Sequence, residues 1–172
     1  LVKMRFTIVV PEEGWLDGDE AGHIPWLEDR IATLFREGGF WDNYRRLLER
    51  ELPTPALRRL DEVTNRILGR LEDPDRPGQW DRRGLVMGHV QSGKTNNYCG
   101  LVAKAADAGY KVIVILAGTY NNLRSQTQQR IDRSIIGRDT SQGPASVTRV
   151  GVGLGGRNPA ILSLTSAIEN GD

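Results

Sequence analysis

The sequence contains a single cysteine, Cys99, among its 172 residues. One thiol cannot form a disulfide within the chain, and it cannot build a zinc site made of several cysteines. The chain has only two histidines, His23 and His89, so it offers no histidine cluster for a metal either. We expect Cys99 to be a small buried apolar residue and His89 to be a polar loop residue.

Long apolar stretches are missing as well. The sequence has no run of about 18 apolar residues, which is the length that a membrane-spanning helix needs. The apolar start, 1–10, contains Lys3 and Arg5 and leads into Pro11 with no cleavage site for a signal peptide. With 38% hydrophobic and 26% charged residues, the composition is typical of a soluble globular protein. We therefore expect a cytoplasmic protein with no membrane partner.

The net charge of +1 conceals two halves of opposite sign. Residues 1–80 carry 12 basic and 16 acidic side chains, a charge of −4. Residues 81–172 carry 11 basic and 6 acidic side chains, a charge of +5. A positive second half suits contact with phosphate or nucleic acid, although a charge of this size also fits an ordinary solvated surface.

Hydrophobic spacing predicts a mainly helical N-terminal region over residues 1–75. Apolar residues recur at helical intervals over 24–35 and again over 40–48. A third helix is better marked, because Thr54 can cap its start and Pro55 suits its first turn. It should end near the stretch EDPDRPGQWDRRG, whose proline, glycine and charge content marks a domain boundary.

The second region, 80–172, changes to a strand, glycine turn, helix, strand and helix. Residues 85–87 are predicted to form a short apolar strand, and an amphipathic helix follows and ends at Gly109. The continuous apolar run 112–116 fits a strand that is buried on both faces of a parallel sheet. The predicted fold class is therefore α/β, with a parallel sheet flanked by helices.

The segment GHVQSGKT, residues 88–95, matches the phosphate-loop (Walker A) pattern G-x-x-x-x-G-K-[ST]. Its glycines let main-chain N–H groups approach an anion at a helix start, Lys94 would reach the β- and γ-phosphates, and the Thr95 hydroxyl would bind Mg²⁺. We therefore predict ATP and Mg²⁺ as cofactors, Lys94 and Thr95 as catalytic residues, and Thr95 as the metal ligand. The predicted cofactor-binding residues are Gly88, Gln91, Ser92, Gly93, Lys94 and Thr95. The alternative is a glycine turn followed by an ordinary solvent-facing lysine.

A second polar motif, AGTYNNLRSQTQQR, follows the apolar run 112–116 at the start of another helix. Its side chains suit hydrogen bonds to phosphate oxygens, and the N–H groups of the helix start add an anion site of their own. The predicted nucleic-acid-binding residues are Thr119, Asn121, Asn122, Arg124 and Gln126. The alternative is a hydrophilic surface helix with a good cap.

A phosphate loop, a helix of about four turns, a strand and a polar turn ending in Leu-x-x-Gln resemble motifs I and Ia of superfamily 2 helicases. More narrowly, GHVQSGKT, GLVAKAADAGYKVIVILAG and NNLRSQTQQRID are similar to the Z1-domain family. That family comprises bacterial proteins described as endonucleases, with a helicase-like ATPase core and links to restriction and phage-defence gene clusters. The similarity is strong over about 80–135 and looser to 172.

The resemblance implies the N-terminal part of a longer, ATP-hydrolysing DNA translocase. It implies a RecA-like P-loop NTPase core, here partial, together with DNA and defence-system subunits as partners. The sequence shows no Walker B acid after the phosphate loop and no nuclease-type acidic cluster. We expect this chain alone to bind nucleotide weakly and to hydrolyse it poorly or not at all.

Two other functions stay open from the sequence, namely a small-molecule P-loop kinase and a non-hydrolysing nucleotide-binding interaction module. The residues just before the phosphate loop also have two interpretations. Gln79 and Trp80 would read the adenine base, or Trp80 would pack the linker onto the core.

Overall fold

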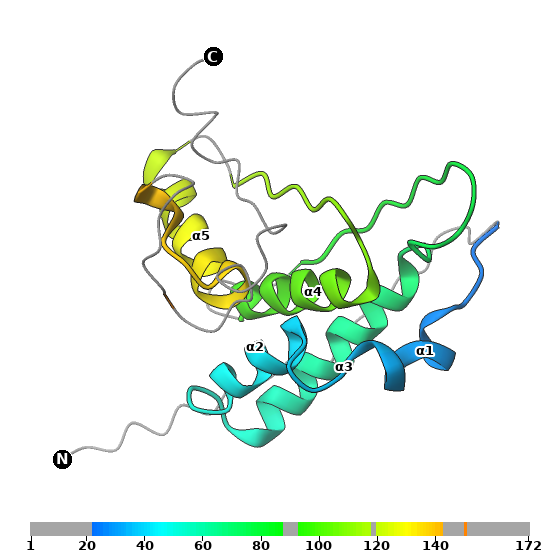
Figure 1. The fold of residues 1–172 in the computed structure, drawn as a ribbon, viewed down its shortest axis with the longest axis horizontal. Coiled ribbons are helices and arrows are strands. Elements are labelled where there is room, and N and C mark those ends of the chain that lie inside the picture. The colour runs from blue at the N-terminus through cyan, green and yellow to red at the C-terminus, as the bar shows by residue number, and fades with distance from the viewer. Residues whose placement is uncertain (1–21, 88–92, 118–119, 143–149, 151–172) are drawn as a thin grey trace.

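The computed structural model describes residues 22–87, 93–117, 120–142 and residue 150. Helices account for 59% of these residues, and none of them forms a β-strand. The elements, in chain order in Figure 1, are α1 (Leu27–Leu34), α2 (Phe40–Leu48), α3 (Thr54–Arg70), α4 (Lys94–Ala108), α5 (Asn121–Ile131), the π-helix η1 (Asp132–Ile136) and the 3-10 helix η2 (Thr140–Gln142).

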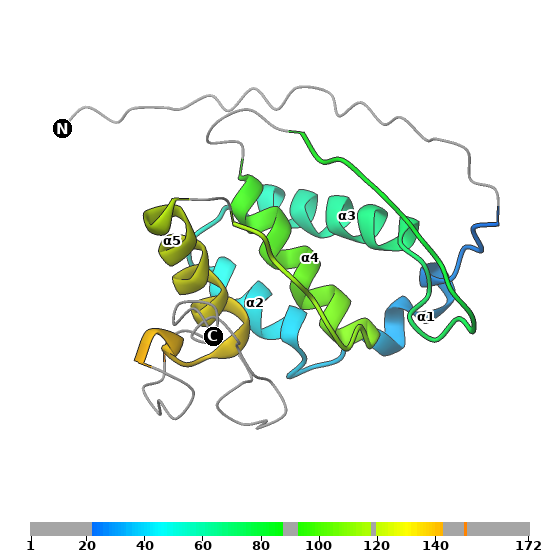
Figure 2. The ribbon, with the colours of Figure 1, turned by 90° about the horizontal axis from the view of Figure 1, so that it is seen from above.

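Helix α4 lies at the centre of the molecule and packs against α2 and α3, as Figures 1 and 2 show. One apolar cluster joins α4 to α2, α3 and η1, and its buried members are Trp41, Tyr44, Leu48, Leu57, Cys99, Ala103 and Ile135. A second cluster contains Trp26, Leu27, Leu68, Ala105 and Ala108. Complete burial of a leucine such as Leu48 or Leu68 contributes roughly 2 kcal/mol to stability.

The backbone of α4 comes close to its neighbours at Gly100. A Cβ atom at this position would lie 3.3 Å from the Trp41 ring and 3.4 Å from the Thr64 methyl group. Thr64 is itself fully buried, and its hydroxyl donates a hydrogen bond of 2.7 Å to the Leu60 carbonyl. The missing side chain at Gly100 therefore allows α4 to rest on both α2 and α3.

A side chain of α4 also holds the start of α2. The Asp107 carboxylate accepts hydrogen bonds of 2.9 Å from the main-chain N–H groups of both Phe40 and Trp41. N–H groups in the first turn of a helix have no partner inside the helix, so Asp107 satisfies two of them. Burial raises the pKa of Asp107, and these two hydrogen bonds oppose that rise.

The predicted helices are largely confirmed. Helix α2 has the predicted bounds, and α4 ends at Ala108 with the predicted stop residue, Gly109, as its C-cap at a φ of 102°. Helix α1 starts later than its pattern suggests, because Ile24 is 62% exposed and precedes the helix. Thr54 is the first residue of α3 and not its cap, since Pro53 occupies the N-cap position.

The predicted α/β fold, a partial RecA-like core with a parallel sheet, is wrong for the residues that the structure describes. Residues 85–87 and 112–116 are not strands, and both segments run back along α4 toward its start in Figures 1 and 2. Their apolar side chains are exposed, by 81% at Leu85 and 91% at Leu116. An apolar run becomes a buried strand only where neighbouring strands pair with its main chain. Here α4 buries its apolar face against α2 and α3 instead.

Candidate functional site

Three residues of the phosphate-loop motif lie in the described part of the chain. Gly93 precedes α4 in the left-handed conformation, with a φ of 80°, which glycine adopts at low cost. Lys94 and Thr95 are the first two residues of α4. Gly88, Gln91 and Ser92 lie outside the described residues, so their roles stay predictions.

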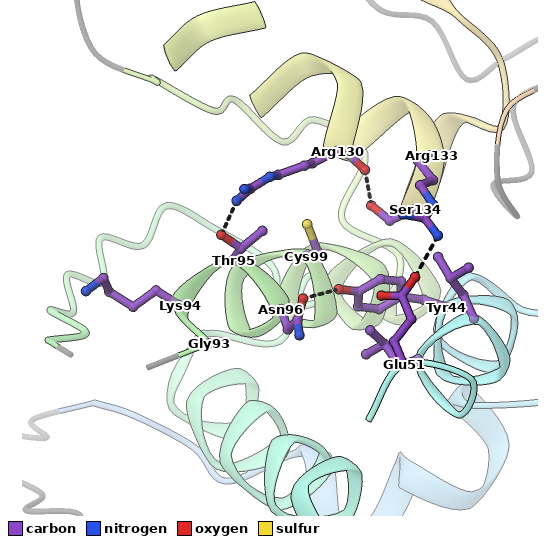
Figure 3. A pocket seen from close by; sticks show the side chains of 12 residues that line it. Tyr44, Glu51, Gly93, Lys94, Thr95, Asn96, Cys99, Arg130, Arg133 and Ser134 are labelled. Atoms are coloured by element: carbon purple, nitrogen blue, oxygen red, sulfur yellow. Dashed lines mark hydrogen bonds and ion pairs between the residues drawn. The ribbon is translucent and has the colours of Figure 1, made fainter. Parts of the chain in front are cut away.

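A cavity of about 570 Å³ opens beside the first turn of α4. Small-molecule sites have volumes of this order. Figure 3 shows the lining side chains, which come from or adjoin α2, α4, α5 and η1: Tyr44, Leu47, Leu48, Glu51, Gly93, Lys94, Thr95, Asn96, Cys99, Arg130, Arg133 and Ser134. The structure thus brings two predicted catalytic residues next to side chains that no motif indicated.

The closest polar contact at the start of α4 joins Thr95 to α5. The Arg130 guanidinium donates a hydrogen bond to the Thr95 hydroxyl, as Figure 3 shows. The backbone of Arg130 is held in turn, because the Ser134 hydroxyl donates a bond of 2.7 Å to the Arg130 carbonyl. Lys94 extends from the start of α4 in another direction, away from Arg130. The predicted metal ligand is therefore engaged by a cation in this structure.

Two further contacts between lining residues join η1 to the segment after α2, and α2 to α4. Arg133 donates a bond of 2.6 Å to the Glu51 carboxylate, and the Tyr44 hydroxyl lies 3.4 Å from the Asn96 side-chain oxygen. Burial raises the pKa of Tyr44 and of the Cys99 thiol, so both groups stay uncharged at neutral pH. The prediction that Cys99 is a buried small apolar residue is confirmed, since it is 1% exposed.

The charged lining residues favour an anion. The lining includes three cationic side chains, Lys94, Arg130 and Arg133, and a single carboxylate, Glu51, which is paired with Arg133. The N-terminus of a helix adds roughly half a positive charge together with N–H groups that lack intrahelical partners. A phosphate group is the kind of ligand that such a site binds.

The predicted nucleic-acid-binding residues lie on the first turns of α5. Asn121, Asn122 and Gln126 are exposed and Arg124 is half-buried, whereas Thr119 lies outside the described residues. None of these four described residues lines the cavity, to which α5 contributes Arg130 instead. The two predicted sets therefore lie at different places, with α5 extending from one to the other.

Sequence reasoning missed Arg130, Arg133 and Ser134. A signal was present, because these residues recur at intervals of three and four and so share one face of a helix. The sequence does not say which element this face meets. Tyr44 and Glu51 were missed because the N-terminal region carries no motif.

Trp80, one of the two residues proposed to read adenine, makes another contact. It packs edge-on against Tyr110, with ring centroids 6.2 Å apart. Arg82, two residues further on, is paired with the Glu72 carboxylate. Trp80 is still 41% exposed. The contact seen is the one expected if Trp80 packs the linker onto the core.

Thr95 was also predicted to bind Mg²⁺. Within the described ranges, no three His, Cys, Asp or Glu side chains are grouped for a metal. Mg²⁺ commonly keeps water ligands and takes others from substrate phosphates, so Thr95 fits an ion that arrives with the nucleotide. In this structure its hydroxyl accepts the hydrogen bond from Arg130, and release of that bond would leave the oxygen open to the ion.

None of the helices described has the length and hydropathy needed to cross a membrane. No protein-family model matches the chain, and comparison with curated proteins and with solved structures gives no match. The similarity to the Z1-domain family therefore stays a prediction based on the quoted motifs.

Proposed function

We propose that this chain binds the phosphate groups of ATP at the start of α4, as part of a cytoplasmic, ATP-dependent protein that acts on DNA in a bacterial defence system. One observation carries the proposal. Lys94 and Thr95, the last two residues of the phosphate-loop motif, form the first turn of a 15-residue helix beside a cavity of about 570 Å³. Hydrolysis, in this proposal, belongs to the complete protein.

Electrostatics support a polyphosphate as the ligand. The phosphate chain of ATP would meet the N–H groups of the first turn of α4 and the ammonium group of Lys94. Charge-assisted hydrogen bonds of this kind are about twice as strong as neutral ones. Mg²⁺ would enter with the nucleotide and take the Thr95 hydroxyl as one ligand.

The DNA part of the proposal rests on α5. Its first turns present Asn121, Asn122 and Gln126 to solvent, with Arg124 beside them. Amide and guanidinium groups at a helix start are suited to phosphate oxygens of a nucleic-acid backbone, which fix position without reading sequence. The same helix reaches the cavity with Arg130.

The first test replaces Lys94 with alanine and measures ATP binding by isothermal titration calorimetry at low salt. We expect Lys94→Ala to weaken binding by about tenfold or more, because a charge-assisted contact to phosphate is lost. Lys111→Ala is the matched control, since Lys111 is an exposed lysine beyond the other end of α4. Equal affinities for the wild type and Lys94→Ala would refute the proposed site.

The same titration with duplex DNA tests the role of α5. Arg124→Ala and Gln126→Ala should weaken binding to unrelated DNA sequences to a similar degree, and Arg124→Ala should reduce the salt slope by about 1. Arg59→Ala on α3 serves as the control. Loss of affinity for one DNA sequence only would contradict a backbone contact.

ATP hydrolysis stimulated by DNA, in the complete protein, would separate this function from a small-molecule kinase.

A further inference from the structure

Helix α5 is held to the molecule mainly at its C-terminal end. Each of its 11 residues is exposed or half-buried, so α5 packs little surface of its own. Four of the five residues of the following π-helix η1 are buried, including Ile135 and Ile136 at 5% and 6% exposure. The hydrogen bond from Arg130 to Thr95 links α5 to the first turn of α4. Breaking or replacing that bond would therefore change how firmly α5 is held to the rest of the molecule.

The partners of Arg130, the Thr95 hydroxyl and the Tyr98 hydroxyl, are a poor match for its chemistry. A guanidinium carries five N–H donors in a planar fork, which suits bidentate contact with phosphate or carboxylate. Both hydroxyls are neutral, and each offers a single oxygen. A phosphate group placed beside Thr95 would be the stronger partner, because its hydrogen bonds to arginine are assisted by charge.

The geometry points to Arg130 as a second phosphate-binding cation of this site, which leaves the Thr95 hydroxyl for the ligand when ATP binds. The inference rests on the proposed function, since the ligand is the polyphosphate at the start of α4. Arg133 lines the same cavity three residues further on, but its guanidinium is held by Glu51. Binding through Arg130 would also tie α5, with its predicted DNA-binding residues, to the occupied site.

In this proposal Mg²⁺ and Arg130 both contact the Thr95 hydroxyl, at different times, and both neutralise the negative charge of the phosphates. Without Mg²⁺, Lys94 and Arg130 are the side-chain cations that neutralise the phosphates in this proposal. With Mg²⁺ bound, Thr95 would hold the ion through its hydroxyl, and the ion would supply part of that charge. Loss of Arg130 should therefore cost more affinity in the absence of Mg²⁺ than in its presence.

The test measures ATP binding to the wild type, Arg130→Gln, Arg130→Lys and Arg133→Gln, in EDTA and in excess Mg²⁺. Arg130→Gln should lower the affinity for ATP roughly tenfold or more in EDTA, and clearly less in Mg²⁺. Arg130→Lys should recover part of the loss. Arg133→Gln removes the same charge from the same cavity and should have the smaller effect on ATP affinity.

Hydrogen exchange gives a second measurement. ATP should slow the exchange of the main-chain amides of α5 in the wild type and not in Arg130→Gln.

The outcomes separate this inference from the function on which it rests. If Lys94→Ala impairs binding but Arg130→Gln matches the wild type, the role of Arg130 is refuted and the site stands. Equal losses for Arg130→Gln and Arg133→Gln, or equal losses with and without Mg²⁺, also refute it, because they indicate only a general effect of charge or folding. If the wild type fails to bind ATP in both buffers, both proposals fall.

Discussion

Lys104 is a fully buried cation in the core between α2, α3 and α4. Its ammonium group donates hydrogen bonds to the Asp61 carbonyl at 2.9 Å, to the Asp61 carboxylate at 2.5 Å and to the Asn65 side-chain oxygen at 2.6 Å. It also lies 4.1 Å from the centre of the Trp41 ring. Burial lowers the pKa of Lys104 to about 8, although the ion pair with Asp61 acts in the opposite direction.

This pKa predicts how stability depends on pH at the scale of one residue. An unfolded lysine titrates near 10.5, so the cost of burying the charge is complete below about pH 8 and disappears as the pH rises toward 10.5. The wild type should therefore gain on the order of 3 kcal/mol relative to Lys104→Met across this window. Urea unfolding of both proteins at pH 7, 8, 9 and 10 measures the difference. A difference that does not change with pH would contradict the burial of a charged Lys104.

At the scale of an element, the contact at Gly100 determines how closely α4 approaches α2 and α3. Gly100→Val should lower the free energy of unfolding by about 1–3 kcal/mol, because its side chain would overlap Trp41 and Thr64. Gly84→Val is the control, since a Cβ atom there meets nothing within 4 Å. Chemical denaturation compares the two variants. Similar stabilities would show that the helices can separate at little cost.

The same scale shows what could be predicted from the sequence. Helices α2 and α4 were predicted well, because hydrophobic spacing and a stop at Gly109 are local signals. The run 112–116 was predicted wrongly, because whether an apolar segment is a strand depends on pairing partners elsewhere in the chain. The buried Lys104 was not foreseen either, since lysine is rarely fully buried and its partners lie on α3.

Some residues of the candidate site could be predicted from the sequence and others could not. Lys94 and Thr95 could be placed at a helix start, because the motif fixes their position relative to the helix that follows. Arg130 and Arg133 could not, because their role depends on how α5 and η1 pack beside α4. Tertiary packing, which no local pattern encodes, brought these arginines to the motif.

At the scale of the whole molecule, Glu72 joins segments from both halves of the chain. Its carboxylate is bound by Arg76 and Arg82, each at 2.5 Å, and lies 3.5 Å from His23. Its carbonyl accepts a hydrogen bond from the Tyr110 hydroxyl. Burial alone would raise the pKa of Glu72, but the bonds from Arg82 and Arg76 lower it to about 2.

The lowered pKa of Glu72 predicts a loss of stability in acid. Because the folded pKa lies below the ordinary value of 4.5, its contribution is complete above about pH 4.5 and is lost as the pH falls toward 2. Glu72→Gln should unfold several degrees below the wild type at pH 7, and the two midpoints should converge between about pH 4.5 and 2. Thermal unfolding at pH 7, 5, 4 and 3 tests this. Midpoints that stay equally far apart would contradict it.

The exposed apolar side chains of 85–87 and 112–116 affect how the protein should be assayed. A fluorescent probe such as ANS, commonly used to detect a molten globule, binds apolar surface wherever it is accessible. In this molecule the folded chain already exposes apolar side chains in these two segments. Dye fluorescence on its own would thus not report unfolding, and loss of near-ultraviolet circular dichroism from Trp41 and Tyr44 would be the better measure.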